Sequence, residues 1–172
     1  MASFREEVES NKGCAVILAG SGSDEKHIDE IVKSLRMYEV PLEVRVKSAH
    51  KQGEDLPDLL ELYDSMKGGL AYIVVAGGVD ALSGTSSFQS WRPTISCPPE
   101  YPKINESCLR NPLGSSNAYI RRPEDVGRLV AQIFAHQNPT YREKLISGIK
   151  AKKEKLKEDD AKLRAKYSWV GV

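Results

Sequence analysis

Two continuous apolar runs and one alternating segment predict the strands of a sheet. Residues 14–19 form a continuous apolar run, and this run ends at Gly20. A second run, residues 71–76, leads into two glycines, and a short one, residues 94–97, stops at a pair of prolines. Such runs are typical of strands buried on both faces of a parallel sheet. Residues 42–46 alternate instead, which predicts a strand with one wetter face.

Three further segments carry apolar residues at helical spacing. Their apolar stripes are Ile28, Ile31, Val32 and Leu35; Leu56, Leu59, Leu60 and Tyr63; and Val126, Leu129, Val130, Ile133 and Phe134. Asp24 or Ser23 is expected to cap the first of these helices. Strands that alternate with helices predict a single doubly wound α/β domain, flavodoxin-like or Rossmann-like, with a parallel sheet and helices on both faces.

The two ends of the chain are expected to differ from this domain. Residues 1–12 are polar and acidic and are predicted to be flexible, residues 13–138 form the α/β domain, and residues 139–172 form a long C-terminal helix. The apolar positions of that helix are sparse: Leu145, Ile149, Leu156 and Leu163. So thin a stripe buries little against its own domain. We therefore expect the helix to pack on a neighbouring subunit, with a partly frayed tail as the alternative.

Charge, apolar run length and cysteine spacing argue against several classes of function. The formal net charge is +1, so there is no global electrostatic case for a nucleic-acid partner or an acidic membrane surface. The longest apolar run is too short to cross a bilayer. The three cysteines have no metal-ligand spacing, and the N-terminus fits neither a signal peptide nor a transit peptide. These features predict a cytoplasmic protein with reduced thiols and no metal.

Two loops carry candidate chemistry, because the carboxyl ends of parallel strands converge at one edge of the sheet. Residues 20–24 (GSGSD) follow the first strand and precede a helix, so small residues and backbone N–H groups could hold a phosphate. The loop matches neither the Walker pattern nor the dinucleotide fingerprint. Residues 48–51 follow the second strand, and there His50 could transfer protons while Lys51 holds an anion. A surface turn is the alternative for this pair.

A third loop, residues 76–84, follows the third predicted strand. Its glycines permit close approach to a planar ligand, and Asp80 could accept hydrogen bonds from ring or amino nitrogens. Asp80 could equally be a helix cap. His27 and His136 fall at helix ends and are expected to be structural.

An ordered set of motifs resembles the phosphoribosylaminoimidazole (AIR) carboxylase family of purine biosynthesis. The matching segments are residues 20–24 with His27, 45–51 (RVKSAHK), 76–77 with 81–84 (ALSG), 95–99 (ISCPP), 107–114 (SCLRNPLG) and 131–134 (AQIF). The resemblance extends over nearly the whole chain, about residues 14–167. The sequence SAH followed by a basic residue, placed after the second strand, is a specific signature of this family.

The resemblance implies one of two activities. One branch of the family carboxylates aminoimidazole ribonucleotide with carbon dioxide, and the other rearranges its N5-carboxylated isomer. Lys51, residues 81–84 and residues 95–99 are similar to the direct carboxylase branch. That branch usually has AGRSN before ALSG, whereas residues 78–80 here are GVD. Gly78 instead matches the mutase branch, but that branch carries a histidine where this chain has Ala81.

By resemblance, His50 is the catalytic base or acid at C4 of the aminoimidazole. Ser21, Asp24 and Lys51 would hold the ribose phosphate, with Ser23 and Ser48 nearby. The full set expected to bind substrate is Ser21, Ser23, Asp24, Ser48, Ala49, Lys51, Gly77, Gly78 and Asp80. The resemblance also implies that no cofactor or metal is needed, and that the partners are the nucleotide, carbon dioxide and copies of the chain in a tetramer or octamer. A non-catalytic nucleotide- or flavin-binding relative is a rival interpretation.

Overall fold

Five parallel strands form one sheet in a computed structural model that describes residues 2–99 and 105–169. In chain order the strands are β1 (Cys14–Ala19), β2 (Leu42–Val46), β3 (Leu70–Val75), β4 (Thr94–Ser96) and β5 (Ala118–Tyr119). Their spatial order is β2-β1-β3-β4-β5, which is the flavodoxin-like arrangement. The predicted doubly wound parallel sheet is confirmed. Sequence analysis missed β5, a two-residue strand without an apolar run.

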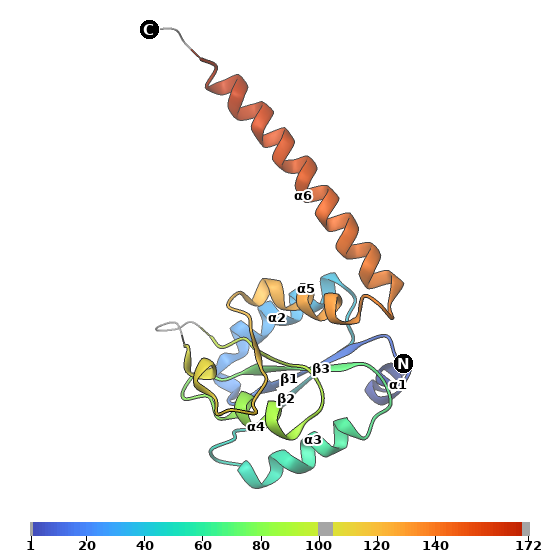
Figure 1. Ribbon diagram of the computed structural model, residues 1–172, viewed down its shortest axis with the longest axis vertical. Coiled ribbons are helices and arrows are strands. Elements are labelled where there is room, and N and C mark those ends of the chain that lie inside the picture. The colour runs from blue at the N-terminus through green and yellow to red at the C-terminus, as the bar shows by residue number, and fades with distance from the viewer. Residues whose placement is uncertain (1, 100–104, 170–172) are drawn as a thin grey trace.

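The helices cover both faces of the sheet (Figure 1). They are α1 (Phe4–Glu9), α2 (Glu25–Met37), α3 (Leu56–Asp64), α4 (Leu82–Gln89), α5 (Pro123–Phe134) and α6 (Pro139–Lys166), with short 3₁₀ turns η1 (Gly22–Asp24), η2 (Gly53–Asp55) and η3 (Ser107–Arg110). Helices α2 and α5 lie on one face, and α3 and α4 lie on the other. Helix α4 was not predicted, because its sequence LSGTSSFQ has no apolar stripe.

The alternation of side chains along β1 explains its continuous apolar run. Ala15, Ile17 and Ala19 pack in the core beneath α2 and α5. Their neighbours, including Val16 and Leu18, pack in a second core beneath α3. Every residue of β1 is buried. A central strand with helices on both sides therefore has no position at which a polar side chain would be tolerated.

Helices α2 and α5 approach so closely that only glycine fits at one contact. A Cβ on Gly127 would stand 2.1 Å from the carbonyl oxygen of Ser34. The Ser34 hydroxyl links the two helices by hydrogen bonds. It donates to the Glu124 carbonyl at 2.8 Å and accepts from the Gly127 N–H at 2.7 Å. This contact holds α2 and α5 together on one face of the sheet.

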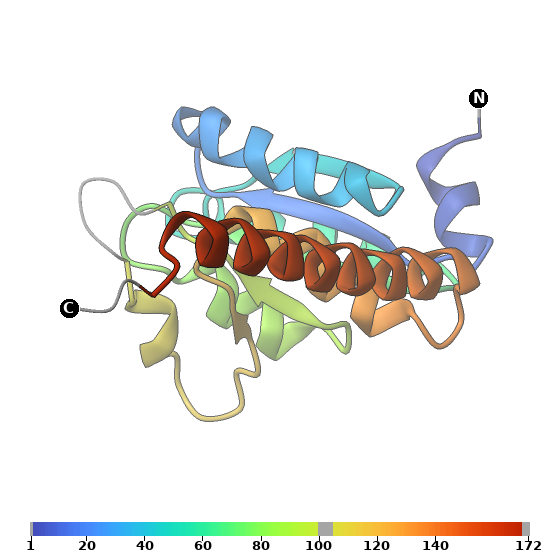
Figure 2. The same cartoon turned by 90° about the horizontal axis from the view of Figure 1, so that it is seen from above.

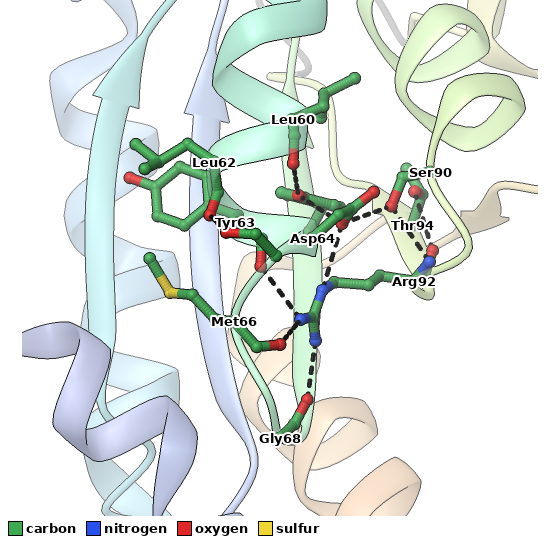
Figure 3. Close-up of polar contacts among 11 residues, drawn as sticks. Leu60, Leu62, Tyr63, Asp64, Met66, Gly68, Ser90, Arg92 and Thr94 are labelled. Atoms are coloured by element: carbon green, nitrogen blue, oxygen red, sulfur yellow. Dashed lines mark hydrogen bonds and ion pairs between the residues drawn. The ribbon is translucent and has the colours of Figure 1, made fainter.

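On the opposite face, a buried arginine ties the end of α3 to the start of β4 (Figure 3). Arg92 Nε donates to Asp64 Oδ1 at 3.1 Å, and its terminal nitrogens donate to the carbonyl oxygens of Tyr63, Met66 and Gly68 at 2.6–3.0 Å. These carbonyls lie at and beyond the helix end, where the regular i to i+4 hydrogen bonds of the helix stop. The guanidinium thus acts as a C-terminal cap for α3.

Strand β2 is an edge strand, and its exposed apolar side chains are Val44 and Val46. The intervening Arg45 is half-buried because its guanidinium donates to the Tyr63 hydroxyl at 3.1 Å. The alternation predicted for this segment is present. The valine side is the more exposed one, because no further strand or helix covers that side of the edge.

The N-terminal segment contains a helix where sequence analysis expects a flexible end. Ser3 and Glu6 form a reciprocal capping box at the start of α1. Val8 is fully buried in the core beneath α3, and that contact holds α1 against the domain. A single buried side chain in a polar, acidic segment gives too weak a periodic signal to be recognised from sequence.

Helix α6 leaves the domain after its first two turns (Figures 1 and 2). Tyr141 and Leu145 are its buried residues, and the remainder of the helix extends away from the sheet. The predicted long C-terminal helix is confirmed. Within the described residues, none of the helices is both long enough and apolar enough to span a membrane.

Candidate active site

A cavity of about 360 Å³ lies at the carboxyl ends of the strands. It sits where the strand order reverses around β1, which is the usual ligand position in open α/β sheets. Its lining comes from the loops after β1, β2 and β3 and from the segment after β4. The lining residues are Gly20, Ser21, Ser23, Asp24, Ser48, Ala49, His50, Ala76, Gly77, Gly78, Val79, Ala81, Leu82 and Pro99.

The loop after β1 presents two exposed hydroxyls to this cavity. Ser21 caps the short turn η1, since its Oγ accepts from the Ser23 N–H at 3.2 Å. The two hydroxyls lie 2.9 Å apart and share a hydrogen bond. Two adjacent hydroxyls that precede a helix N-terminus suit the binding of an anionic oxygen.

Asp24 occupies the N-cap position of α2, but its carboxylate makes no capping hydrogen bond, contrary to the expectation from sequence. Ser23 lies inside η1 and is not the cap residue of α2. The Asp24 carboxylate instead lies beside Gly77, where an added Cβ would be 3.4 Å from Asp24 Oδ1 and 3.4 Å from Pro99. The loops after β1, β3 and β4 therefore converge at this point. The carboxylate is left at the cavity wall as an acceptor.

The loop after β2 forms a tight turn that orients His50. The carbonyl oxygen of Ser48 accepts from the N–H groups of Lys51 and Gln52 at 3.2 and 2.8 Å. Ala49 packs against the core beneath α3, whereas the His50 side chain is exposed and lines the cavity. Lys51 is exposed and does not line the cavity, so the structure separates the two residues that sequence analysis paired.

The loop after β3 brings Gly77 and Gly78 to the cavity, as expected, but not Asp80. The Asp80 carboxylate is buried and accepts from the N–H and the Oγ of Ser83, at 2.8 and 2.7 Å. These are bonds to the first turn of α4. Of the two roles considered for Asp80, the structure supports the helix cap.

Two other residues near the site were not assigned to it from sequence. Pro99 lines the cavity beside Gly77. His27, on α2, donates from Nε2 to the carbonyl oxygen of Cys97 at 2.9 Å, two residues before Pro99. A carbonyl can only accept, so Nε2 carries the hydrogen. The expected structural role of His27 fits this contact. Its partner could not have been found from local sequence.

A second cavity, of about 600 Å³, lies between the N-terminal ends of α2 and α5. Charged side chains line most of it, including Glu30, Arg122, Glu124 and Asp125. Of the three loops proposed to carry chemistry, none contributes to its lining. We therefore assign the site to the smaller cavity.

Comparison with known proteins identifies the family of this chain. The sequence profile of AIR carboxylase matches residues 14–155, which include all three loops. This chain belongs to the AIR carboxylase family. The resemblance drawn from its motifs is therefore confirmed, and with it the assignment to a carboxylase family of purine biosynthesis.

Individual relatives extend over nearly the whole chain. The phosphoribosylaminoimidazole carboxylases of Treponema denticola and Archaeoglobus fulgidus are 32% and 30% identical, each over 87% of this chain and over 96% and 84% of their own lengths. The crystal structure of Treponema denticola PurE superposes with a TM-score of 0.81 at 31% identity, and the match covers 88% of this chain and 99% of that one. The human bifunctional phosphoribosylaminoimidazole carboxylase/phosphoribosylaminoimidazole succinocarboxamide synthetase matches over 91% of this chain but 38% of its own length.

Proposed function

We propose that this AIR carboxylase family member carboxylates 5-aminoimidazole ribonucleotide at C4 with carbon dioxide. The observation that carries the proposal is the position of His50. Its imidazole lines one cavity together with the hydroxyls of Ser21 and Ser23 and the glycines after β3. In the proposed complex, the nucleotide has its phosphate at one end of the cavity and its base at the other. The His50 imidazole would then lie within reach of the base for proton transfer.

The chemistry needs few groups. C4 of the aminoimidazole is enamine-like and attacks the carbon of carbon dioxide, so that a C–C bond forms and one C=O π pair moves to oxygen. His50 then removes the C4 proton, the ring recovers its aromaticity, and 4-carboxy-5-aminoimidazole ribonucleotide results. Decarboxylation runs through the same steps in reverse. Enclosure of the cavity would limit the escape of carbon dioxide to water.

Binding roles follow from the lining. Ser21, Ser23 and Ser48 are proposed to donate to the ribose phosphate, and Asp24 to accept from a ribose hydroxyl, because a carboxylate repels phosphate. Lys51 would contact the phosphate from outside the cavity, since its side chain is exposed beside the His50 turn. Ala49 and Gly77 would contribute backbone contact with the substrate.

The mutase reaction is a second candidate, favoured by one feature. Gly78 leaves open space around its Cα where the direct branch has an arginine, and glycine occupies this position in the mutase branch. The carboxylase is supported by residues 81–84 and 95–99, which are similar to the direct branch.

A paired-substrate assay tests the proposal. Purified protein is given aminoimidazole ribonucleotide with bicarbonate, and in a separate reaction the N5-carboxylated isomer, and the formation of the C4 carboxylate is followed by absorbance. We expect product from the first reaction. Product from the second reaction alone would establish the mutase. Binding of nucleotide or flavin without turnover of either substrate would favour a non-catalytic module.

We further propose a homo-oligomer, tetramer or octamer, in the cytoplasm. The exposed stripe Ile149, Leu156 and Leu163 along α6 is suited to pack on a second copy of the chain. The three cysteines are buried, and Cys14 and Cys108 are free thiols, which fits a reducing compartment. Light scattering after gel filtration measures the mass against the 19.1 kDa of one chain, and a monomer would reject the assembly.

A further inference from the structure

The turn that carries His50 is closed at its base by an ion pair. Lys47 directly follows β2, and its Nζ donates to Asp55 Oδ2 at 2.6 Å. Asp55 occupies the N-cap position of α3, yet its carboxylate makes no capping hydrogen bond there. The carboxylate therefore joins the two ends of the turn and does not satisfy the backbone of its own helix. Residues 48–54 lie between the two partners.

Both partners of this pair sit on backbone that the core holds in place. The Lys47 N–H donates to the Ala19 carbonyl oxygen at 2.8 Å, next to the last residue pair of the β1–β2 ladder. Leu56, which follows Asp55, is fully buried in the core beneath α3. The Lys47 side chain is 19% exposed. A pair between ordered partners costs less conformational freedom than a pair between two mobile surface side chains.

A second, smaller closure lies inside the first. The Gln52 N–H donates to the Ser48 carbonyl oxygen at 2.8 Å, and Gln52 Oε1 accepts from the Ser48 N–H at 3.4 Å. Between these two residues, Ala49 packs against the core beneath α3 and His50 lines the cavity. His50 is thus the middle residue of the inner closure, and the Lys47–Asp55 pair surrounds it.

The direction of the His50 ring depends on this turn alone. Among the hydrogen bonds between described residues, none involves the His50 imidazole. His27 differs, because a carbonyl oxygen holds its ring. A base must stay aligned with the proton that it removes, and a turn that leaves the aligned conformation lowers the rate by the fraction of time it spends away.

We propose that Lys47 and Asp55 are positioning residues, and that their ion pair holds the turn in the conformation that directs His50 into the cavity. The kinetic part of this inference rests on the proposed function, whereas the effect of the pair on the turn does not. Neither residue lines the cavity. The pair therefore acts through the backbone of the turn and not by contact with the substrate.

Lys47→Met and Asp55→Asn each remove the pair and retain most of the side-chain volume. In both variants we expect kcat at saturating aminoimidazole ribonucleotide and bicarbonate to fall about three- to fivefold, the scale of one partly exposed ion pair, with KM little changed. The two substitutions change the net charge in opposite directions. A general electrostatic effect on the substrate phosphate would therefore shift KM in opposite directions, and that result would overturn the positioning role.

Glu54→Gln is the matched control for Asp55→Asn. Glu54 is the exposed neighbour of Asp55, and its substitution makes the same change of charge. This variant should keep the kcat of the wild type. A loss equal to that of Asp55→Asn would show that the charge of the segment matters and not the ion pair.

Two further variants test whether Lys47 and Asp55 act as a pair. Lys47→Arg keeps a donor for Asp55 and should restore most of kcat. Lys47→Met combined with Asp55→Asn should lose no more than either single variant, because the same interaction is removed once. Losses that multiply, or a wild-type kcat in both single variants, would contradict the proposal.

Hydrogen exchange separates the failure of this inference from failure of the proposed function. Mass spectrometry of the segment 47–55 without substrate should show faster backbone exchange in Lys47→Met and Asp55→Asn, and wild-type exchange in Glu54→Gln. Unchanged exchange in both variants overturns the role of the pair, whichever reaction the wild type runs. A wild type that converts neither substrate overturns the proposed function, while faster exchange still supports the pair. Thermal unfolding checks that each variant is folded, and if one single variant is not, the other decides.

Discussion

His27 and Cys97, seventy residues apart in the chain, are joined by a hydrogen bond of 2.9 Å from the imidazole Nε2 to the backbone carbonyl oxygen. Cys97 Sγ lies 3.6 Å from the same nitrogen. The contact links α2, which follows the serine loop, to the segment that carries Pro99 into the cavity wall. Two walls of the site are thereby held at a set separation.

Loss of this link should weaken substrate binding more than catalysis. For His27→Ala we expect KM for aminoimidazole ribonucleotide to rise several-fold, with kcat and the pH profile little changed. His27→Gln, which retains a donor of similar reach, should restore most of the affinity. His136→Ala, at an exposed helix end, is the control. Wild-type KM in His27→Ala would show that the wall stays in place without the bond.

Replacement of His50 should abolish turnover without unfolding the protein. The side chain is exposed in the cavity, so His50→Gln removes no packing. A general base commonly contributes about 10²–10⁴-fold to rate, and we expect kcat to fall by that order. Circular dichroism and nucleotide binding check the fold. A rate near that of the wild type would remove His50 from the mechanism.

Asp80 should behave as a cap and not as a substrate ligand. Removal of its two bonds to Ser83 is expected to cost about 1–2 kcal/mol of unfolding free energy in Asp80→Ala. Ser83→Ala keeps the N–H bond to Asp80 but removes the hydroxyl, which also accepts from Asn111 Nδ2 at 2.9 Å, and the double variant should lose less than the sum of the two. Urea titration measures all three. If KM rises by orders of magnitude while stability holds, Asp80 contacts substrate.

The buried guanidinium of Arg92 should contribute far more to the free energy of unfolding than a surface arginine does. Arg92→Met removes the guanidinium that donates to three carbonyls and to the Asp64 carboxylate, which keeps its hydrogen bonds from Tyr72 and Ser90, and we expect a loss of about 3 kcal/mol. Arg5→Ala breaks an exposed ion pair with Glu9 and should cost less than about 0.5 kcal/mol. Chemical denaturation compares the two. Equal losses of unfolding free energy in the two variants would mean that packing of the methionine side chain makes up for the hydrogen bonds of Arg92.

Alkaline pH should destabilise the fold through its buried acids. Burial raises the pKa of the Cys14 thiol from 9.0 to about 12, and that of Tyr63 from 10.0 to about 12. A raised folded-state pKa gives stability that is complete below the unfolded value, so it declines from about pH 9 and is lost as pH reaches 12. Each group contributes up to about 1.4 kcal/mol per pH unit.

Denaturant unfolding between pH 8 and 11 measures this decline, and Cys14→Ala isolates one contribution. The slope of unfolding free energy against pH should be shallower in the variant than in the wild type. The slopes are compared, and not the absolute values, because the variant also leaves a small void at a fully buried position. Identical slopes would show that Cys14 does not titrate on unfolding.

Local pattern was sufficient for the main elements of the fold. The runs at β1 and β3 and the stripes of α2, α3 and α5 are apolar because each faces a core, and that requirement is visible at a period of two or three to four residues. Helix α4, strand β5 and helix α1 escaped prediction for the converse reason. Their stability comes from single contacts, such as Asp80 with Ser83 or the burial of Val8, which leave no periodic trace.

The sequence by itself determined the sheet, the three loops at its carboxyl edge and the family to which their motifs belong. Only the tertiary structure decided which residues of those loops meet. It directs His50 into the cavity and leaves Lys51 outside, makes Asp80 a cap, and brings Asn105 behind the loop after β3. Hydrogen bonds between residues far apart in the chain depend on the packing of whole elements, and so no local spacing encodes them.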